Sequence, residues 1–323
     1  MTLFRNKKIL IIGDVMIDSY LFGNVERVSP EAPVPIIDIE LKQDKLGGAA
    51  NVATNIKNLG GTPILCSVIG KDQKGDIFLS ILKDMEIETD YIYQSEHRIT
   101  TVKTRIIGNS GSGNHQMLRI DEEVKTDLHD QNELLSLIDK VLEKEIIDCI
   151  LFQDYDKGVL NEFNIKIITE KAKSLNIPTI VDPKKKNFAH YKNVNLFKPN
   201  FKEFREGLNL TGLNKLEMLE AGAKILHKKG IEIVFITLSE DGIFISYKKN
   251  KKSIRIVVPG VSRDVVDVSG AGDTVISVVS MLLNDMNIEE IAKIANLAGG
   301  IVCEEIGVVS INKDKLLKEY YER

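Results

Sequence analysis

The sequence predicts an α/β protein in which a doubly wound, mostly parallel sheet carries helices on both faces. Three observations predict this fold. Short apolar runs of strand length alternate with amphipathic stretches of helix length along most of the 323 residues. Many of the apolar runs end in a polar residue or a glycine, as buried parallel strands do where they enter loops. The alternation breaks once, where strand-like segments follow one another without helices.

The first part of the chain begins with a buried strand. Residues 8–13 form an apolar run that stops at Gly13-Asp14. Residues 34–40 are predicted to be an edge strand, because Pro35 cannot donate a hydrogen bond to a neighbouring strand. The elements predicted next are a helix at 48–59, a strand at 64–69 and a helix at 75–85.

A β-rich insertion then interrupts the alternation. Residues 91–93, 100–107 and 115–120 look like three short strands, and the glycine-rich stretch 108–113 is a flexible turn. Together with residues around 20 to 40, this insertion can form a small separate sheet.

The alternation returns after Asp121 and continues to the end. The predicted strands lie at 146–152, 179–181, 194–198 and 231–238, with a hairpin of 242–247 and 254–258. The predicted helices lie at 132–142, 163–174, 216–227, 271–283 and 288–303, with a short one from Asp314. Since no linker or repeat divides the chain, we expect one domain, 1–323.

Composition excludes several classes of protein. A net charge of −4 without a basic stripe argues against a nucleic-acid binder, and the lysines at 248–252 form a solvated hairpin turn. The histidines show no zinc motif. Cys66, Cys149 and Cys303 lie in apolar runs, as buried thiols in a reducing cytoplasm do. The apolar runs are too short for a signal peptide or a membrane span, so a soluble cytoplasmic protein is expected.

The sharpest motif is Asp-Val-Ser-Gly-Ala-Gly-Asp-Thr at 267–274. Small residues let a ligand approach the backbone, and the helix that starts here presents its N-terminal amides to an anion. Asp273, in the first turn, can accept a proton from an attacking hydroxyl beside that anion hole. A glycine turn with an aspartate that caps the helix is the alternative, and the motif alone does not separate the two.

A second motif opens the helix at 48–59. Gly47 and Gly48 again allow close approach of a ligand, and Asn51 lies one turn in, where it can reach sugar hydroxyls. The alternative is a helix whose small residues serve only tight packing.

Polar residues follow five of the predicted strands. Because parallel strands end at one edge of a sheet, these residues share a rim and predict a common site, although each alone could be a solvated loop. They are Asp14 and Asp18, residues 154–158, residues 182–184, Asn200 and Glu203, and residues 239–242.

The Gly-Gly-Ala-Ala-Asn segment at 47–51, the Asn200-x-x-Glu203 pair and Gly-Ala-Gly-Asp at 270–273 resemble the signatures of the ribokinase-like (PfkB) sugar kinases. The resemblance covers essentially the whole chain. It implies a ribokinase-like core with a small β-sheet lid, formed here by strands at about 20–40 and 90–120. It also implies ATP and Mg²⁺ as cofactors, a homodimer that pairs through the lid, and Asp273 as the catalytic base.

One subgroup is more similar still, the D-glycero-β-D-manno-heptose 7-phosphate kinases, which phosphorylate the anomeric 1-hydroxyl on the way to ADP-heptose and lipopolysaccharide. The segments that carry this resemblance are 13–18, 28–35, 47–53, 154–158, 182–184 and 267–274. Another PfkB sugar kinase or a non-catalytic nucleotide-binding protein is the alternative. A Rossmann dehydrogenase is excluded, because no GxGxxG follows the first strand. Some members carry a C-terminal nucleotidyltransferase domain. No such signature precedes Arg323, which predicts a stand-alone kinase.

The resemblance also assigns substrate residues. The sugar is expected at Asp14, Asp18, Gly47, Gly48 and Asn51, and the reacting end and phosphates near Lys157, Asp182 and Lys184. The anion hole is assigned to Gly270, Ala271 and Gly272. Arg105 and Arg119 are candidates for the sugar's 7-phosphate, since guanidinium groups bind phosphate bidentately, with surface ion pairs as the alternative.

The nucleotide residues follow from the same resemblance. Asn200 and Glu203 are expected to position Mg²⁺ through water, because Mg²⁺ keeps much of its hydration. Thr237, Ser239 and Gly242 would line the nucleotide, with Asn296 and Gly300 near adenine. Many family members bind K⁺ beside the anion hole, and Asp267, Ser269 and the backbone near Gly307 match that region. Ser269 stands where threonine is commoner.

Overall fold

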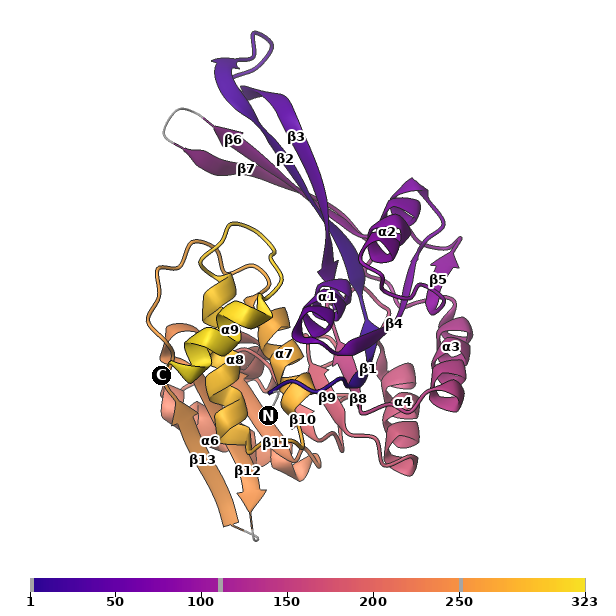
Figure 1. The fold of residues 1–323 in the computed structure, drawn as a ribbon, viewed down its shortest axis with the longest axis vertical. Coiled ribbons are helices and arrows are strands. Elements are labelled where there is room, and N and C mark those ends of the chain that lie inside the picture. Colours follow the sequence, from indigo (N-terminus) through magenta and orange to yellow (C-terminus); the bar gives the residue numbers. More distant parts are fainter. Residues whose placement is uncertain (1–2, 110–112, 250–251, 323) are drawn as a thin grey trace.

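We analysed a computed structural model that describes residues 3–109, 113–249 and 252–322. Within these residues, nine strands form a large sheet and four form a small one (Figure 1). The large sheet runs in the order β13 (Lys252–Val258), β12 (Ile243–Lys249), β11 (Ile233–Thr237), β10 (Leu196–Phe197), β9 (Thr179–Asp182), β8 (Cys149–Gln153), β1 (Lys8–Gly13), β4 (Thr62–Gly70) and β5 (Ile92–Ser95). All its neighbours pair in parallel except β11 with β12 and β12 with β13. The predicted fold class is confirmed.

Helices cover both faces of the large sheet and divide the apolar core into two layers. Ile9 and Ile11 of β1 face one layer, and Leu10 and Ile12 face the other, because successive side chains alternate across a strand. The first layer packs against α1 (Ala49–Leu59), α2 (Gln73–Asp84), α7 (Ala271–Leu282), α8 (Ile288–Val302) and α9 (Lys313–Tyr321). The second packs against α3 (Gln131–Lys144), α4 (Glu162–Ser174), α5 (Phe201–Gly207) and α6 (Lys215–Lys228).

The small sheet projects from the core as a narrow arm (Figure 1). Its order is β3 (Pro35–Gly48), β2 (Val15–Val28), β6 (Val102–Asn109) and β7 (Asn114–Glu122), and we call these strands the lid. β2 pairs antiparallel with β3 and parallel with β6. The expected strand at 34–40 is the first half of β3, which starts at Pro35 and continues to Gly48, and β2 starts at Val15, before the expected lid start near residue 20. Both strands reach the base of the arm, where β3 ends at Gly48 and α1 begins.

The predicted lid strand at 91–93 is a correction. Residues of β5 pair in parallel with β4, so this strand is the edge of the large sheet. Tyr91 and Ile92 are buried against the core, and burial of these apolar side chains places the strand there. The second part of the lid therefore begins at Val102. Helix α5, which starts directly after Pro199 and Asn200, was not predicted because it is too short for a clear periodic pattern.

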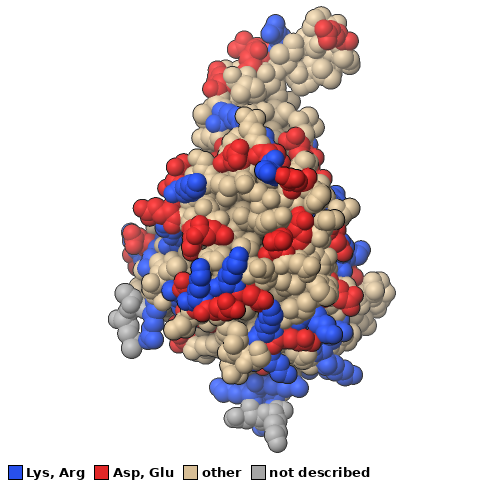
Figure 2. Space-filling model, turned by 90° about the vertical axis from the view of Figure 1, so that its right-hand side faces the viewer, with Lys and Arg blue, Asp and Glu red and all other residues tan. Residues whose placement is uncertain are grey.

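The surface agrees with a protein of low net charge. On the face beside α2 and α3, acidic and basic side chains are interspersed, and basic ones gather at the foot of the molecule (Figure 2). Lys248, Lys249 and Lys252 are exposed at the β12–β13 turn, as predicted, although residues 250–251 lie outside the described part. All three cysteines are buried free thiols. Among the helices that the structure describes, none is long and apolar enough to cross a membrane.

Candidate active site

Asp273 lies in the first turn of α7, directly after the small residues 270–272, and its side chain is buried. Its carboxylate accepts three hydrogen bonds from other parts of the chain. The donors are Asn51 Nδ2 at 2.8 Å, Gln153 Nε2 at 3.0 Å and the Tyr155 hydroxyl at 2.5 Å. Three elements distant in sequence, α1, β8 and α7, therefore meet at this carboxylate.

The environment of Asp273 suits a base that works near neutral pH. Burial raises its pKa to about 6, hydrogen bonds from Tyr155 and Asn51 oppose the rise, and the nearby Asp182 carboxylate adds to it. A base with a pKa close to the working pH combines a useful ionised fraction with a strong pull on the proton. The geometry thus gives Asp273 the properties that the motif alone left open.

The turn that leads into α7 has backbone N–H groups that can hold an anion. Gly270 has a φ of +82°, a left-handed conformation that favours glycine, and it turns the chain into the helix. The amides of a first helical turn lack helical partners and attract negative charge. A Cβ on Gly272 would lie 3.8 Å from Lys198 Nζ, so the Lys198 ammonium lies beside this turn. Gly270, Ala271 and Gly272 therefore keep their predicted place next to the base.

Lys198 was not predicted as a site residue. It is buried after β10, and its Nζ lies 3.0 Å from an oxygen of Asp182 at the end of β9. Gln153, at the end of β8, donates to Asp182 at 3.4 Å as well as to Asp273. Three neighbouring parallel strands thus place the Asp182 carboxylate, the Lys198 ammonium and the Gln153 amide at one rim.

The predicted nucleotide side begins at the N-terminus of α5. Asn200 Oδ1 accepts the Glu203 N–H at 2.9 Å, and Glu203 Oε2 accepts the Asn200 N–H at 2.9 Å. The other Glu203 oxygen forms an ion pair with Lys184, whose ammonium lies 5.2 Å above the centre of the Tyr155 ring. Burial disfavours the charged Lys184, but the Asp182 and Glu203 carboxylates outweigh it and raise its pKa. The structure brings these predicted residues together.

The other residues predicted to contact the nucleotide lie at the end of β11, in the turn after it and on α8. Asn200 forms a parallel bridge with Thr237, and Ser239 starts a short 3₁₀ turn (Ser239–Asp241). Gly242 has a φ of +96°, and a Cβ there would lie 2.1 Å from the Val258 carbonyl oxygen. Asn296 of α8 donates to the Val258 and Pro259 carbonyls at 3.2 and 3.0 Å.

Gly300 lies one turn beyond Asn296 and makes room for Arg263. A Cβ on Gly300 would lie 2.7 Å from Arg263 Cδ. Arg263 is held there by ion pairs with Glu304 and Glu319. In this structure both Asn296 and Gly300 position the chain around 258–263, and their contact with adenine stays a prediction.

Asp14 holds the loop that follows β8. Its buried carboxylate accepts the N–H groups of Tyr155 at 2.8 Å, Lys157 at 3.2 Å and Val159 at 3.0 Å. Burial raises the pKa of Asp14, and these three hydrogen bonds oppose the rise. Asp14 therefore positions Tyr155 against the base, and its predicted contact with the sugar stays a prediction.

The base of the lid carries the remaining sugar residues. Asp18 on β2 forms an ion pair with Arg105 on β6, and the guanidinium lies 5.3 Å from the Tyr20 ring centre. A Cβ on Gly47 would lie 2.2 Å from an Asp18 oxygen, so only glycine leaves room for this pair. Gly48 ends β3 with a φ of +60°.

Arg119 and Lys157 are both engaged in ion pairs, the first within β7 and the second between the loop after β8 and the residue that follows β7. Arg119 lies opposite Arg105 in the β6–β7 register, but it pairs with Asp121 at 2.9 Å and is half exposed. Lys157 pairs with Glu123 at 2.7 Å. For Arg119 the structure matches the alternative reading, a surface ion pair.

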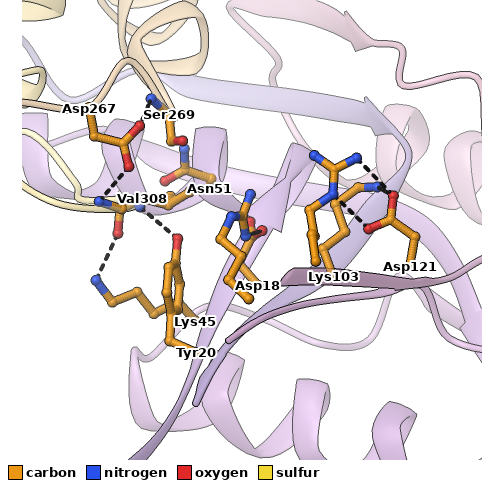
Figure 3. A network of polar contacts seen from close by, with 12 residues as sticks. Asp18, Tyr20, Lys45, Asn51, Lys103, Asp121, Asp267, Ser269 and Val308 are labelled. Atoms are coloured by element: carbon orange, nitrogen blue, oxygen red, sulfur yellow. Dashed lines mark hydrogen bonds and ion pairs between the residues drawn. The ribbon is translucent and has the colours of Figure 1, made fainter. Parts of the chain in front are cut away.

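The lid is joined to the end of the chain by a polar network (Figure 3). Tyr20 accepts the Val308 N–H at 3.0 Å, and Lys45 donates to the Val308 carbonyl at 2.9 Å. Asp267 accepts the N–H groups of Ser269 at 2.9 Å and Gly307 at 2.8 Å. Burial alone would raise the pKa of Asp267, but these hydrogen bonds lower it, so the carboxylate stays ionised beside the anion hole.

The pfkB family carbohydrate kinase model matches residues 6–315. The chain belongs to the pfkB carbohydrate kinase family. Membership is consistent with the first reading of the 267–274 motif, and the roles of Asp273 and of the turn at α7 stay predictions.

Two relatives and one solved structure are similar to this pfkB chain over nearly its whole length. It is 36% identical over 317 residues to the bifunctional protein HldE of Helicobacter hepaticus, covering 97% of this chain and 64% of that protein. It is 37% identical over 318 residues to the bifunctional protein HldE of Sulfurimonas denitrificans, covering 98% and 64%. The chain thus spans less than two thirds of these relatives. Phosphofructokinase-2 from Escherichia coli in complex with potassium matches with a TM-score of 0.78 over 98% of this chain and 99% of that one, and at 18% identity it supports the fold alone.

Two residues beside Asp273 and Asp182 were missed by sequence reasoning, and a third was named only as part of a segment. Gln153 and Lys198 belong to no motif, whereas Tyr155 lies in the predicted segment 154–158 without a role of its own. Their position in the sequence could have identified them, since each stands at or just after the end of a parallel strand, where the shared rim was expected.

Proposed function

We propose that this chain transfers the γ-phosphoryl group of ATP to the anomeric 1-hydroxyl of D-glycero-β-D-manno-heptose 7-phosphate, for ADP-heptose and lipopolysaccharide synthesis. The observation that carries the proposal is the buried Asp273 carboxylate, with a pKa of about 6, beside the anion hole. The sugar is inferred from the segments that resemble heptose 7-phosphate kinases and from the identity to the HldE proteins over nearly the whole chain.

In the proposed reaction Asp273 accepts the proton of the 1-hydroxyl as the sugar oxygen bonds to the γ-phosphorus. The bond between that phosphorus and the β–γ bridging oxygen breaks, and ADP leaves with its electron pair. Lys198 and the amides at 270–272 stabilise the charge on the transferring group. The Tyr155 hydroxyl, which donates to Asp273, must give way to the substrate hydroxyl.

The residues at α5 and α7 fit the cations that the family uses. Mg²⁺ would be held near Glu203 and Asn200 through water, where it would neutralise phosphate charge, and Glu203 already holds the Lys184 cation. K⁺ would lie near Asp267, Ser269 and Gly307, where the carboxylate stays ionised. The cytoplasm, which supplies ATP and keeps thiols such as Cys66 reduced, is the proposed compartment.

We also propose that two copies pair through their lids. β7 is exposed along its whole described length, and the large exposed apolar side chains of the lid are Val28, Ile39, Leu41, Met117, Leu118 and Ile120. A sheet with this much exposed apolar surface is expected to be covered by a partner. Arg105, at the base of the lid, is the residue that we propose binds the sugar's 7-phosphate.

The test is a panel of acceptors with ATP and Mg²⁺: heptose 7-phosphate, fructose 6-phosphate and ribose. The heptose phosphate is expected to give the highest kcat/KM. Faster turnover of fructose 6-phosphate or ribose would overturn heptose 7-phosphate as the acceptor and leave the kinase assignment intact. No turnover of any acceptor, with ATP binding retained, would favour a non-catalytic nucleotide-binding protein.

A further inference from the structure

Two histidines and an aspartate converge where the β5–β6 and β7–α3 connections meet. Ligand atoms of His97, His129 and Asp130 all lie within 4.8 Å of one another. The two imidazole rings are 4.3 Å apart at their centres, and both histidines are exposed. Imidazole nitrogens and a carboxylate oxygen at this spacing are the donor set of a divalent transition ion.

The carboxylate of Asp130 is oriented for such an ion. One of its oxygens accepts a hydrogen bond from the Ser95 hydroxyl, and the other lies 3.2 Å from His129 Nδ1. A hydrogen bond behind a ligand fixes its direction and supports metal binding. A metal ion bound by His129 and Asp130 would take the place of this direct contact.

The charges around the cluster are of both signs. Burial and the nearby Asp130, Glu133 and Glu96 carboxylates raise the pKa of Tyr93, and Lys71, which forms an ion pair with Glu96 at 2.8 Å, opposes the rise. The Arg98 guanidinium is a second cation here, because it lies close enough to Asp130 to interact. Its Nη2, however, is directed to the Lys157 carbonyl at 2.7 Å.

The cluster joins the two connections between the core and one half of the lid. His97 lies between β5 and β6, and His129 and Asp130 lie between β7 and α3. The same two connections contact the loop after β8, since Arg98 donates to Lys157 and the Leu128 N–H donates to the Gly158 carbonyl at 2.9 Å.

We propose that His97, His129 and Asp130 bind a Zn²⁺-class divalent ion, with water completing the coordination, and that the ion ties these two connections together. Imidazole ligands select against Mg²⁺, which prefers oxygen, so this site is separate from the one for Mg²⁺ and ATP. The ion would restrain β6 and β7 relative to the core. The proposal does not depend on which sugar the enzyme uses.

Calorimetric titration of the full chain with ZnCl₂, in buffer with excess Mg²⁺, tests the site. Wild type is expected to bind Zn²⁺ saturably with micromolar affinity, and His97→Ala and His129→Ala are each expected to weaken binding by about 10-fold or more. His190→Ala is the matched control, because His190 is a partly exposed histidine paired with Glu162 outside the cluster, and it should bind as wild type does. Absence of saturable binding, or equal losses in all three variants, would overturn the proposal.

Hydrogen exchange checks the structural consequence. Zn²⁺ is expected to slow amide exchange in residues 96–101 and 123–130 of wild type, with no such slowing in His129→Ala. Thermal unfolding of the variants without metal should match wild type, since both histidines are exposed. Binding that leaves exchange in both connections unchanged would refute the tie between them.

Discussion

The core and the lid of this kinase are built on opposite principles. In the core, strands buried on both faces end in polar groups that already contact one another, so Asp273 has three side-chain donors before any substrate arrives. In the lid, apolar side chains are exposed, and the ion pair of Asp18 with Arg105 lies at its base. Under the proposed function, the phosphoryl-transfer chemistry is preorganised in the core, whereas the sugar side is completed by the lid.

The largest effect is expected in the core. Asp273→Asn should lower kcat by about 10²- to 10⁴-fold, because the general base is lost while the shape of the site is kept. ATP affinity, measured by calorimetry, should change little. Asp264→Asn, an exposed carboxylate on the preceding segment, is the control and should keep wild-type turnover. Full turnover in Asp273→Asn would remove Asp273 as the base.

The next largest effect is a difference in KM between substitutions of the two lid arginines. Arg105→Ala should raise the KM for the sugar phosphate by about 10-fold or more, because a hydrogen bond to a charged group is worth about 1.5–3 kcal/mol. Arg119→Ala should change KM by less, since Arg119 is half exposed and paired with Asp121. Steady-state kinetics with varied sugar phosphate measure both. Equal effects of the two changes would contradict a special role for Arg105.

A smaller effect concerns the exposed lid surface. Leu118→Lys places a charge on an exposed apolar side chain, so it should weaken self-association by about 10-fold or more without unfolding the core. Sedimentation velocity over a concentration series is the measurement. The matched control, Ile146→Lys, changes an exposed apolar residue of the core surface and should leave association unchanged. A monomeric wild type would exclude the lid-paired dimer.

The smallest effect is a shift in pH dependence. Activity should fall as the pH drops through about 6, because Asp273 must be ionised to accept a proton. The Tyr155 hydroxyl hydrogen-bonds to the ionised carboxylate and lowers its pKa. Tyr155→Phe should therefore move the acidic limb of the kcat/KM profile to higher pH. An acidic limb that moves to lower pH would contradict this role for Tyr155.

Much of the core and the centre of the site could be predicted from local patterns. The apolar runs that became β1, β4, β8 and β11 were found because a parallel strand buried on both faces is almost wholly apolar. Gly270 and Gly48 were found because each belongs to a run of small residues that opens a helix, and both have a positive φ in the structure. The lid strands were harder, because β2 and β3 mix polar and apolar residues along their whole length.

The sequence by itself determined the α/β alternation, the turn before α7 and the identity of Asp273 as the candidate base. Tertiary structure alone decided that Gln153, Tyr155 and Lys198 complete the site, that Arg105 rather than Arg119 is held at the lid base, and that β5 belongs to the core. The physical reason is that backbone preferences and apolar patterns are local, while hydrogen bonds, desolvation and the pKa of a buried carboxylate depend on groups brought together from distant parts of the chain.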